Sequence, residues 1–193
     1  AEGNAGNMLS ESELKELKER GNDKRVAERI AGRIAAKRAI QALTGVRPGG
    51  IRIRNRTNGA PWVEIQGAQS PKLSISHSNG YAVAVASWKQ AIGVDLEEVV
   101  ERSQPFLEEW FRPMEKTLVG SDPLRQNLAW SAKEAVLKAL GEGMALSPRD
   151  VELISSDRST LEVKLHGQVA QALRETGYRK ASLQWRLFEG LLW

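Results

Sequence analysis

The dipeptide Asn79-Gly80 limits the possible folds of this chain more than any other sequence feature. It separates two strand-like runs, Leu73–Ser78 and Tyr81–Ser87. Asn-Gly is the commonest two-residue loop between antiparallel strands. The pattern therefore predicts a β-hairpin, and with it a fold that contains antiparallel strands.

A long helix is expected before this hairpin. Apolar residues recur every four positions at Val26, Ile30 and Ile34, which indicates an apolar stripe along a helix from about Asp23 to Leu43. Gly45 lies just beyond it and suits a helix C-terminus. The chain therefore combines a strong helical segment with antiparallel strands.

The remaining elements are shorter. Ser10 precedes an acidic turn and predicts the N-cap of a first helix, which Gly21-Asn22 ends. Helices and antiparallel strands together predict the α+β class. The other expected elements are a turn-rich hairpin or loop (Gly49–Trp62), a strand (Ile92–Glu97), helices (Glu108–Val119, Asn127–Leu140, Gly167–Thr176), strands (Val151–Ile154, Thr160–Leu165, Ser182–Leu187) and a last hairpin arm (Leu191–Trp193).

Two helical segments of the chain echo each other. Ala35–Gly45 reads AAKRAIQALTG and Ser131–Gly141 reads SAKEAVLKALG. The echo suggests two similar α+β halves with a site at their junction. We therefore expect a linker and short helix over residues 1–22, an N-terminal half over 23–91 and a C-terminal half over 92–193, together forming one pseudo-dimeric domain.

Composition excludes several classes of protein. The 193 residues are 41% hydrophobic and carry a formal net charge of +4, which does not fit a disordered chain. There is no cysteine, which excludes a disulfide framework, a thiolate metal site and a Cys nucleophile. With only two histidines, we do not expect a multi-His zinc site. No apolar run approaches the roughly 20 residues of a membrane helix, and no secretory signal is present, so we expect a cytoplasmic protein without a membrane partner.

Two carboxylates are expected side by side in the segment IGVDLE. If Ile92–Glu97 is a strand, Asp95 and Glu97 point to the same face. Carboxylates this close repel unless a cation joins them, and hard oxygen ligands suit Mg²⁺ bound to a substrate phosphate. The alternative is an exposed acidic strand end, since Glu98 and Glu101 follow.

The helix Asn127–Leu140 carries a second group of charged residues. Trp130, Glu134 and Lys138 are spaced four residues apart and share one face, and Lys133 lies beside Glu134. An ordinary ion pair on a solvated helix explains this spacing. Otherwise Glu134 is a third metal ligand or a base, and the lysines bind phosphate.

The segment LSISHS ends with His77 next to the hairpin turn, where strands present functional groups. Leu73, Ile75 and His77 share a face, so a core or capping histidine is the plainer interpretation. A Ser-His-Asp triad would lack the G-x-S-x-G nucleophile elbow.

Basic residues form a stripe on the long helix. Arg25, Arg29, Arg33 and Lys37 recur every four residues. Either the stripe faces solvent, or it binds an acidic ligand.

Three motifs occur along the chain in the order SISHS, GVDLE and WSAKEAVLKA. Together they resemble the motifs of the 4′-phosphopantetheinyl transferase superfamily. Their order is similar to that of its pseudo-dimeric, surfactin-synthetase-activating type. The resemblance implies transfer of 4′-phosphopantetheine from coenzyme A to a serine of an acyl or peptidyl carrier protein, with release of 3′,5′-ADP. It implies a Mg²⁺ cofactor, a monomeric pseudo-dimer and no nucleic-acid partner. The residues it implies are Asp95, Glu97 and Glu134 for Mg²⁺; Glu134 and Lys138 for catalysis; and Arg29, Lys37, Ser76, His77, Lys133 and Lys138 for coenzyme A.

The sequence departs from that pattern at two places. Ala60 in Gly59-Ala60-Pro61 replaces a lysine that contacts phosphate in the family, and no strand is evident before the first long helix. The missing strand, together with a last hairpin arm that is cut short at Leu191–Trp193, fits a domain excised from, or fused at the end of, a larger synthase. Two other functions stay open, namely a basic nucleic-acid-binding module and an inactive domain that docks carrier proteins.

Overall fold

The computed structural model describes residues 8–19, 23–88, 91–141 and 145–193. The chain divides into two compact units, residues 1–94 and 95–193, which we call unit 1 and unit 2. Each unit combines helices with antiparallel strands, which confirms the α+β class. In the part of the chain described, no helix is both long and apolar enough to span a membrane.

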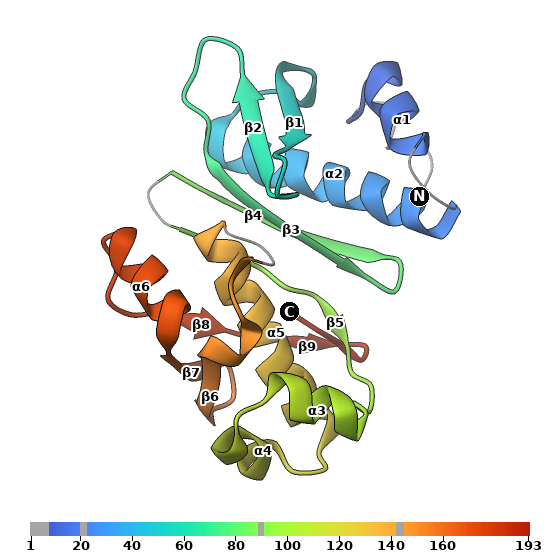
Figure 1. Ribbon diagram of the computed structural model, residues 1–193. Coiled ribbons are helices and arrows are strands. Elements are labelled where there is room, and N and C mark those ends of the chain that lie inside the picture. The colour runs from blue at the N-terminus through green and yellow to red at the C-terminus, as the bar shows by residue number, and fades with distance from the viewer. Residues whose placement is uncertain (1–7, 20–22, 89–90, 142–144) are drawn as a thin grey trace. The chain divides into compact units, whose positions relative to one another are not determined.

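Unit 1 is built around helix α2 (Asp23–Thr44). It packs against the hairpin of β3 (Lys72–Ser78) and β4 (Tyr81–Ser87), and β3 also contacts β2 (Pro61–Ile65), which pairs with β1 (Ile51–Asn55) (Figure 1). The apolar residues of α2 and of the strands that face it form one core. Its buried members are Ala36, Ile40, Ile51, Ile53, Val63, Ile65 and Leu73.

The β3–β4 hairpin confirms the expectation from Asn79-Gly80. Ser78 pairs with Tyr81, and Asn79 and Gly80 have φ angles of 48° and 80°. Helix α2 approaches this hairpin closely at Gly32, where an added Cβ atom would lie 3.1 Å from Cγ2 of Ile75. Gly32 therefore sets how near the helix comes to the sheet.

Within unit 1, helix α1 (Glu11–Lys18) is attached to α2 by polar contacts. The Ser10 hydroxyl accepts a hydrogen bond from the backbone N–H of Glu13, and the Glu13 carboxylate accepts one from the backbone N–H of Ser10. This capping box is the N-cap expected from the sequence. Glu13 also binds Lys37 of α2, as described below.

Helix α5 (Pro123–Leu140) is the central element of unit 2. Its apolar residues pack on two small antiparallel sheets and on shorter helices, and the aromatic rings of Phe106 and Trp130 meet edge-to-face at 4.8 Å. The sheets are β6 (Val151–Ser156), β7 (Thr160–Leu165) and β8 (Leu183–Gln184), and β5 (Glu97–Glu98), β10 (Leu191–Leu192) and β9 (Leu187–Phe188). The helices are α3 (Gln104–Trp110), α4 (Pro113–Val119) and α6 (Gly167–Glu175).

Three expected elements of unit 2 are wrong in extent. The strand expected over Ser182–Leu187 is two strands, since β8 pairs with β7 and β9 pairs with β10. Only Glu97 and Glu98 of the acidic segment form a strand, because they alone pair with Leu191 and Leu192; residues 92–96 form no strand. The single helix expected over Glu108–Val119 is two helices, since Pro113 starts a new one after the chain turns at Phe111.

The same order of elements follows the long helix in each unit. Helix α2 is followed by Gly45 (φ 73°), a 3₁₀ turn over Pro48–Gly50 and then β1. Helix α5 is followed by Gly141 (φ 74°), a 3₁₀ turn over Pro148–Asp150 and then β6. The echo in the sequence thus marks a repeated helix, turn and hairpin.

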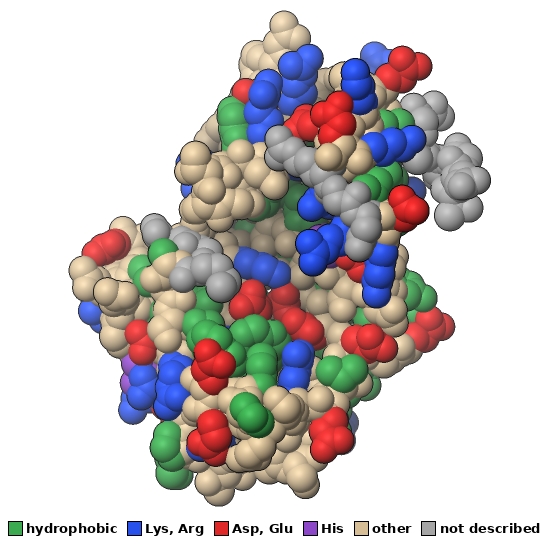
Figure 2. All heavy atoms as spheres, turned by 45° about the vertical axis from the view of Figure 1, so that its right-hand side comes forward, with side chains coloured by type: hydrophobic (Ala, Val, Ile, Leu, Met, Phe, Trp, Pro, Cys, Tyr) green, Lys and Arg blue, Asp and Glu red, His purple; other side chains and the backbone are tan. Residues whose placement is uncertain are grey.

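Charge is divided unevenly between the units. Residues 1–94 contain 15 basic and 8 acidic residues, a net charge of +7, whereas residues 95–193 contain 13 basic and 16 acidic residues, a net charge of −3. Figure 2 shows Lys and Arg side chains gathered on one face of unit 1. The basic character of the chain is therefore a property of unit 1.

Candidate active site

A buried ion pair joins Asp95 to helix α5. Asp95 is 5% exposed, and Nζ of Lys138 lies 2.6 Å from its Oδ1 atom. The Lys138 side chain keeps 30% of its surface exposed. A cation beside a buried carboxylate offsets the cost of burying its charge, and the exposed part of Lys138 is accessible from solvent.

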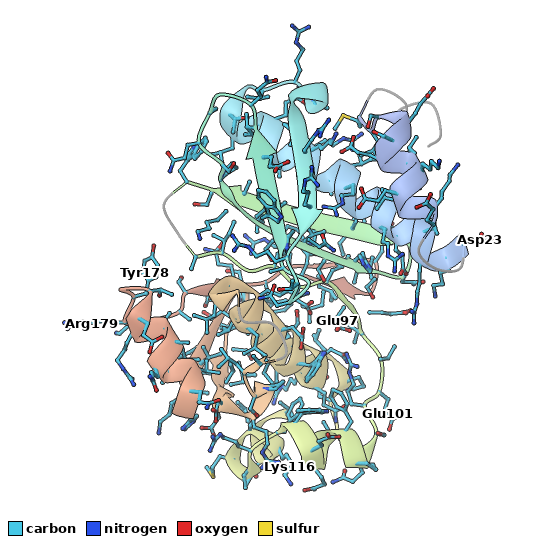
Figure 3. All side chains as sticks on the ribbon, turned by 45° about the horizontal axis from the view of Figure 1, so that its top comes forward. Asp23, Glu97, Glu101, Lys116, Tyr178 and Arg179 are labelled. Carbon is cyan, nitrogen blue, oxygen red and sulfur yellow. The ribbon has the colours of Figure 1, made fainter. Side chains whose placement is uncertain are left out.

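Glu97 is labelled in Figure 3. Both of its carboxylate oxygens accept hydrogen bonds. Nε1 of Trp130 donates to Oε1 at 3.1 Å, and Nη2 of Arg102 donates to Oε2 at 2.9 Å. Trp130 comes from α5, on the helix face that the sequence predicts to carry Glu134 and Lys138. The Glu97 carboxylate is therefore held in one orientation from two sides.

Glu134 is electrostatically coupled to the two carboxylates before it. Burial raises the pKa of Glu134; the charge of Lys138 lowers it, and the charges of Asp95 and Glu97 raise it further. Burial likewise raises the pKa of Glu97, and the Asp95 charge adds to that effect. These three acids and Lys138 therefore form one cluster in unit 2, which we call the acidic cluster.

The donor chemistry of the acidic cluster suits a hard divalent cation, although no group of three His, Cys, Asp or Glu side chains in the described part of the chain is arranged as a finished metal site. Lys138 and Arg102 instead hydrogen-bond to two of the carboxylates. Mg²⁺ in phosphate-transfer sites usually has only one or two carboxylate ligands and completes its shell with water and substrate phosphate. The residues present fit such an ion once the Lys138 ammonium moves from Asp95.

Lys133 lies in the core of unit 2, which differs from the expected phosphate contact. Lys133 and Glu115 are both 0% exposed, and Nζ of Lys133 lies 2.7 Å from Oε2 of Glu115. It also donates to the backbone oxygen of Val151. Burial lowers the pKa of Lys133, and the Glu115 charge opposes this shift. With its ammonium used inside the core, Lys133 is not presented to a ligand.

Lys37 has an equivalent environment in unit 1, so it too is not placed for the expected contact with coenzyme A. Its side chain is 1% exposed, and its Nζ lies 2.8 Å from Oε2 of Glu13 and 3.1 Å from the backbone oxygen of Pro48. Glu13 and Glu115 occupy the same position, N3 of the short helix that precedes each long helix. The identity of Lys37 and Lys133 in the sequence echo was the signal for this shared role.

The other expected coenzyme A contacts lie in unit 1, on α2 and β3. His77 is exposed, and its Nδ1 lies 3.5 Å from Oε2 of Glu28. Ser76 is buried, and Arg29 has one guanidinium nitrogen, Nη1, that is buried without a hydrogen-bond partner. His77 is therefore not a core histidine.

Ala60 lies between β1 and β2, where its backbone N–H donates to Oδ1 of Asn58 at 3.1 Å. Its methyl group has no donor for a phosphate, so the role of the family lysine is not filled at this position.

Arg102 and Asn127 support the acidic cluster and were not identified from the sequence. Nε of Arg102 donates to Oδ1 of Asn127 at 2.9 Å. Arg102 follows Glu97 by five residues, which is a weak signal, and a single Asn in an amphipathic helix gives none.

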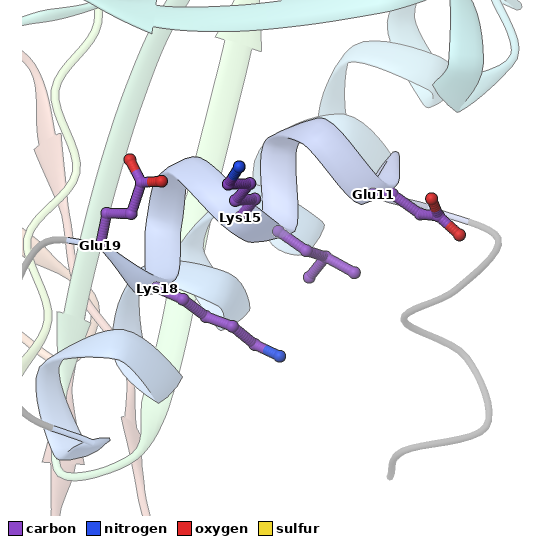
Figure 4. Close-up of a pocket in the computed structure, with 5 residues that line it drawn as sticks. Glu11, Lys15, Lys18 and Glu19 are labelled. Atoms are coloured by element: carbon purple, nitrogen blue, oxygen red, sulfur yellow. The ribbon is translucent and has the colours of Figure 1, made fainter.

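A hollow beside α1 shares no residue with the acidic cluster. Its wall is formed by Glu11, Leu14, Lys15, Lys18 and Glu19 (Figure 4).

Comparison with known proteins relates most of unit 2 to one family. Residues 91–184 match the family model described as the 4′-phosphopantetheinyl transferase superfamily. The chain is 30% identical to the 4′-phosphopantetheinyl transferase HetI of Nostoc over 141 residues, which are 68% of this chain and 60% of HetI. It is 34% identical to fatty acid synthase subunit alpha of Schizosaccharomyces pombe over 121 residues, which are 60% of this chain and 6% of that subunit.

Among solved structures, the holo-ACP-synthase of Plasmodium yoelii matches with a TM-score of 0.42 and 25% identity, over 52% of this chain and 87% of that one. The chain thus spans 60% of the transferase and a small part of the synthase subunit to which it is similar.

Proposed function

Because this chain belongs to the 4′-phosphopantetheinyl transferase superfamily, we propose that it moves 4′-phosphopantetheine from coenzyme A to a serine of an acyl or peptidyl carrier protein. The observation that carries the proposal is the acidic cluster, in which Lys138 is partly exposed and bonded to Asp95, and the charges of Lys138, Asp95 and Glu97 all act on Glu134. The whole cluster lies within the residues that match the family model.

The reaction converts the pyrophosphate anhydride of coenzyme A into a phosphodiester of the carrier serine. The serine oxygen forms a bond to the phosphorus that carries pantetheine, and the bond from that phosphorus to the leaving 3′,5′-ADP oxygen breaks. Such transfers depend on neutralising phosphate charge more than on covalent help from the protein. A site without a Cys nucleophile or a serine elbow is adequate for this chemistry.

Glu134 is the base in this proposal. A carboxylate whose pKa is raised by burial and by neighbouring negative charges accepts a proton more readily than an exposed one. It would take the proton from the carrier serine as the new ester bond forms.

Lys138 is the cation that stabilises the reacting phosphate. Its ammonium would move from Asp95 to the phosphate oxygens, where the benefit is largest as charge develops in the transition state. Bound Mg²⁺ would supply further charge neutralisation at the pyrophosphate, with Asp95, Glu97 and Glu134 as the residues that would hold it.

Unit 1 supplies the remaining contacts to coenzyme A in this proposal. Arg29 has a buried, unsatisfied guanidinium nitrogen, and His77 and Ser76 lie at the end of β3. The net charge of +7 in residues 1–94 suits a ligand rich in phosphate. Lys37 and Lys133 are left out of the ligand set, because their ammonium groups are bonded to buried glutamates.

The test is to incubate the chain with coenzyme A, Mg²⁺ and an apo carrier protein, and then to measure the mass of the carrier. An acyl carrier protein of fatty acid synthesis is the first substrate to try, since a fatty acid synthase subunit is among the similar proteins. Glu97→Gln should abolish the mass gain, whereas Glu101→Gln, an exposed acid four residues later, should not. Absence of any mass gain with both acyl and peptidyl carriers would reject the proposal.

A further inference from the structure

We infer that Arg102, held in place by Asn127, is a positioning residue that fixes the Glu97 carboxylate for metal binding. The inference rests on the proposed function, because it takes Glu97 as a ligand of the divalent cation. Neither residue belongs to the motifs that identify the family in this sequence, and both act through another side chain.

The guanidinium group of Arg102 is held at two separate nitrogens. Nη2 donates to Oε2 of Glu97 and Nε donates to Oδ1 of Asn127, both at 2.9 Å. The guanidinium carbon also lies 5.0 Å from the centre of the Phe106 ring. A planar group fixed on two edges and one face cannot rotate freely, so it transmits its orientation to Glu97.

Asn127 has only one amide orientation that satisfies its neighbours. It is 0% exposed, and its Nδ2 donates to the backbone oxygens of Val100 at 2.5 Å and Pro123 at 2.7 Å. With both N–H bonds used on carbonyl oxygens, the amide oxygen must face Arg102. The side chain is therefore a rigid acceptor on α5.

The Arg102 backbone is anchored to the same helix. Its N–H donates to Oε1 of Gln126 at 3.3 Å, and Nε2 of Gln126 donates to the backbone oxygen of Gly120 at 2.8 Å. Two neighbouring amide side chains at the start of α5 thus hold both the backbone and the side chain of Arg102. Glu97 lies on the two-residue strand β5, which is too short to fix its side chain. Helix α5 fixes it instead, through Arg102.

Arg102 is expected to affect metal binding by Glu97 through the orientation of the carboxylate and not only through its own charge. A positive charge beside Glu97 repels a metal ion, so removal of charge alone would strengthen cation binding. Loss of orientation acts in the opposite direction, since groups that orient metal ligands typically account for about 10- to 100-fold in metal affinity. A variant that keeps the charge but loses the second hydrogen bond separates these effects.

The deciding variant is Arg102→Lys in the full chain, with binding of Mn²⁺ in the presence of coenzyme A measured by electron paramagnetic resonance. A lysine keeps the charge but lacks the planar guanidinium group whose two nitrogens bond Glu97 and Asn127 separately. We expect its dissociation constant for Mn²⁺ to rise about 10-fold. The Mg²⁺ concentration for half-maximal transfer should rise with it, at an unchanged KM for coenzyme A.

Arg125→Lys is the matched control. Arg125 lies on the same helix and pairs with Asp122 at 3.4 Å, and the two side chains are 58% and 48% exposed. Mn²⁺ binding by this variant should equal that of the wild type. If Arg102→Lys does not fold, Arg102→Met also removes both hydrogen bonds of the guanidinium group, and its dissociation constant for Mn²⁺ should rise despite the lost charge.

Glu97→Gln separates a failure of the role inferred for Arg102 from a failure of Glu97 as a metal ligand. Weak Mn²⁺ binding by both Glu97→Gln and Arg102→Lys supports the inference. Weak binding by Glu97→Gln with normal binding by a folded Arg102→Lys overturns it. Normal binding by Glu97→Gln removes Glu97 from the metal ligands, which instead contradicts that part of the proposed function.

Discussion

Lys138 places its Nζ atom 2.6 Å from Oδ1 of Asp95, so the cation proposed to bind substrate phosphate also neutralises a buried carboxylate. In the proposed reaction the ammonium moves from this carboxylate toward the phosphate. A cation that arrives at Asp95 in its place would offset the cost of that move. Binding of a divalent ion and release of Lys138 are therefore expected to be coupled.

Lys138→Ala should slow transfer much more than it weakens coenzyme A binding. A cation that acts mainly in the transition state lowers kcat when removed, and we expect a loss of about 100-fold. Steady-state kinetics with coenzyme A as the varied substrate measure both constants. Lys164→Ala removes an exposed lysine of the same unit and should change neither. A raised KM with an unchanged kcat for Lys138→Ala would assign the residue to ground-state binding.

Asp95→Ala should abolish transfer and leave the fold intact. Asp95 is a buried acid whose charge raises the pKa of both Glu97 and Glu134, so its loss also relieves repulsion within the acidic cluster. The measurements are transfer activity at millimolar Mg²⁺ and thermal unfolding. Activity near that of the wild type would remove Asp95 from the site.

The pH dependence of kcat should report the raised pKa of Glu134. As a base it must be ionised, so kcat should fall with decreasing pH at a higher pH than an ordinary glutamate would require. Stability should respond to pH in the opposite direction. Because the pKa of Glu134 is higher in the folded state than in the unfolded state, the folded state binds more protons at pH values between the two. The free energy of unfolding should then decrease as pH rises above the ordinary glutamate range.

Glu134→Gln should remove the contribution of Glu134 to the pH dependence of stability together with the activity, whereas the contribution of Glu97, whose pKa is also raised, remains. Unfolding at a series of pH values compares the two proteins directly. A wild-type profile identical to that of Glu134→Gln would show that Glu134 has an ordinary pKa.

Lys133→Met should destabilise the protein strongly, because it leaves Glu115 buried without its cation. Breaking one partner of a buried pair costs about 3–5 kcal/mol, whereas an exposed pair contributes below about 1 kcal/mol. Lys116→Ala, which breaks the more exposed pair with Glu108, is the control. The double variant Lys133→Met with Glu115→Leu should recover much of the loss. Denaturant unfolding checks all four proteins.

Arg29→Ala should raise the KM for coenzyme A, and Arg25→Ala should change it little. Arg29 has a buried guanidinium nitrogen without a hydrogen-bond partner, whereas Arg25 is exposed at the start of α2. Coenzyme A without its 3′-phosphate should lose less affinity on Arg29→Ala than coenzyme A does. Equal effects of the two substitutions, with no dependence on the 3′-phosphate, would contradict the assignment of Arg29.

Features that depend on nearby residues could be predicted from the sequence. Asn79-Gly80 gave the hairpin with its register, because the turn itself needs two residues with positive φ. Ser10 gave the N-cap of α1 for the same local reason. The proximity of Glu134 and Lys138 followed from helical spacing alone.

Features that depend on distant partners could not be predicted. Glu97 is in a strand only because Leu192 pairs with it from the far end of the chain. The burial of Lys133 depends on Glu115 in a separate helix, and the support of Glu97 depends on Asn127. The break at Pro113 is different, since a proline at that position was a local signal for a helix start.

The contact between Glu13 and Lys37 decides where this domain can be shortened. Sequence patterns alone favour a boundary at Asp23, where the long helix begins, and a protein trimmed there would lack Glu13. The Lys37 ammonium would then lose its carboxylate partner and keep the hydrogen bond to the Pro48 carbonyl. An expression boundary for unit 1 therefore belongs before Ser10, so that α1 and its capping box are retained.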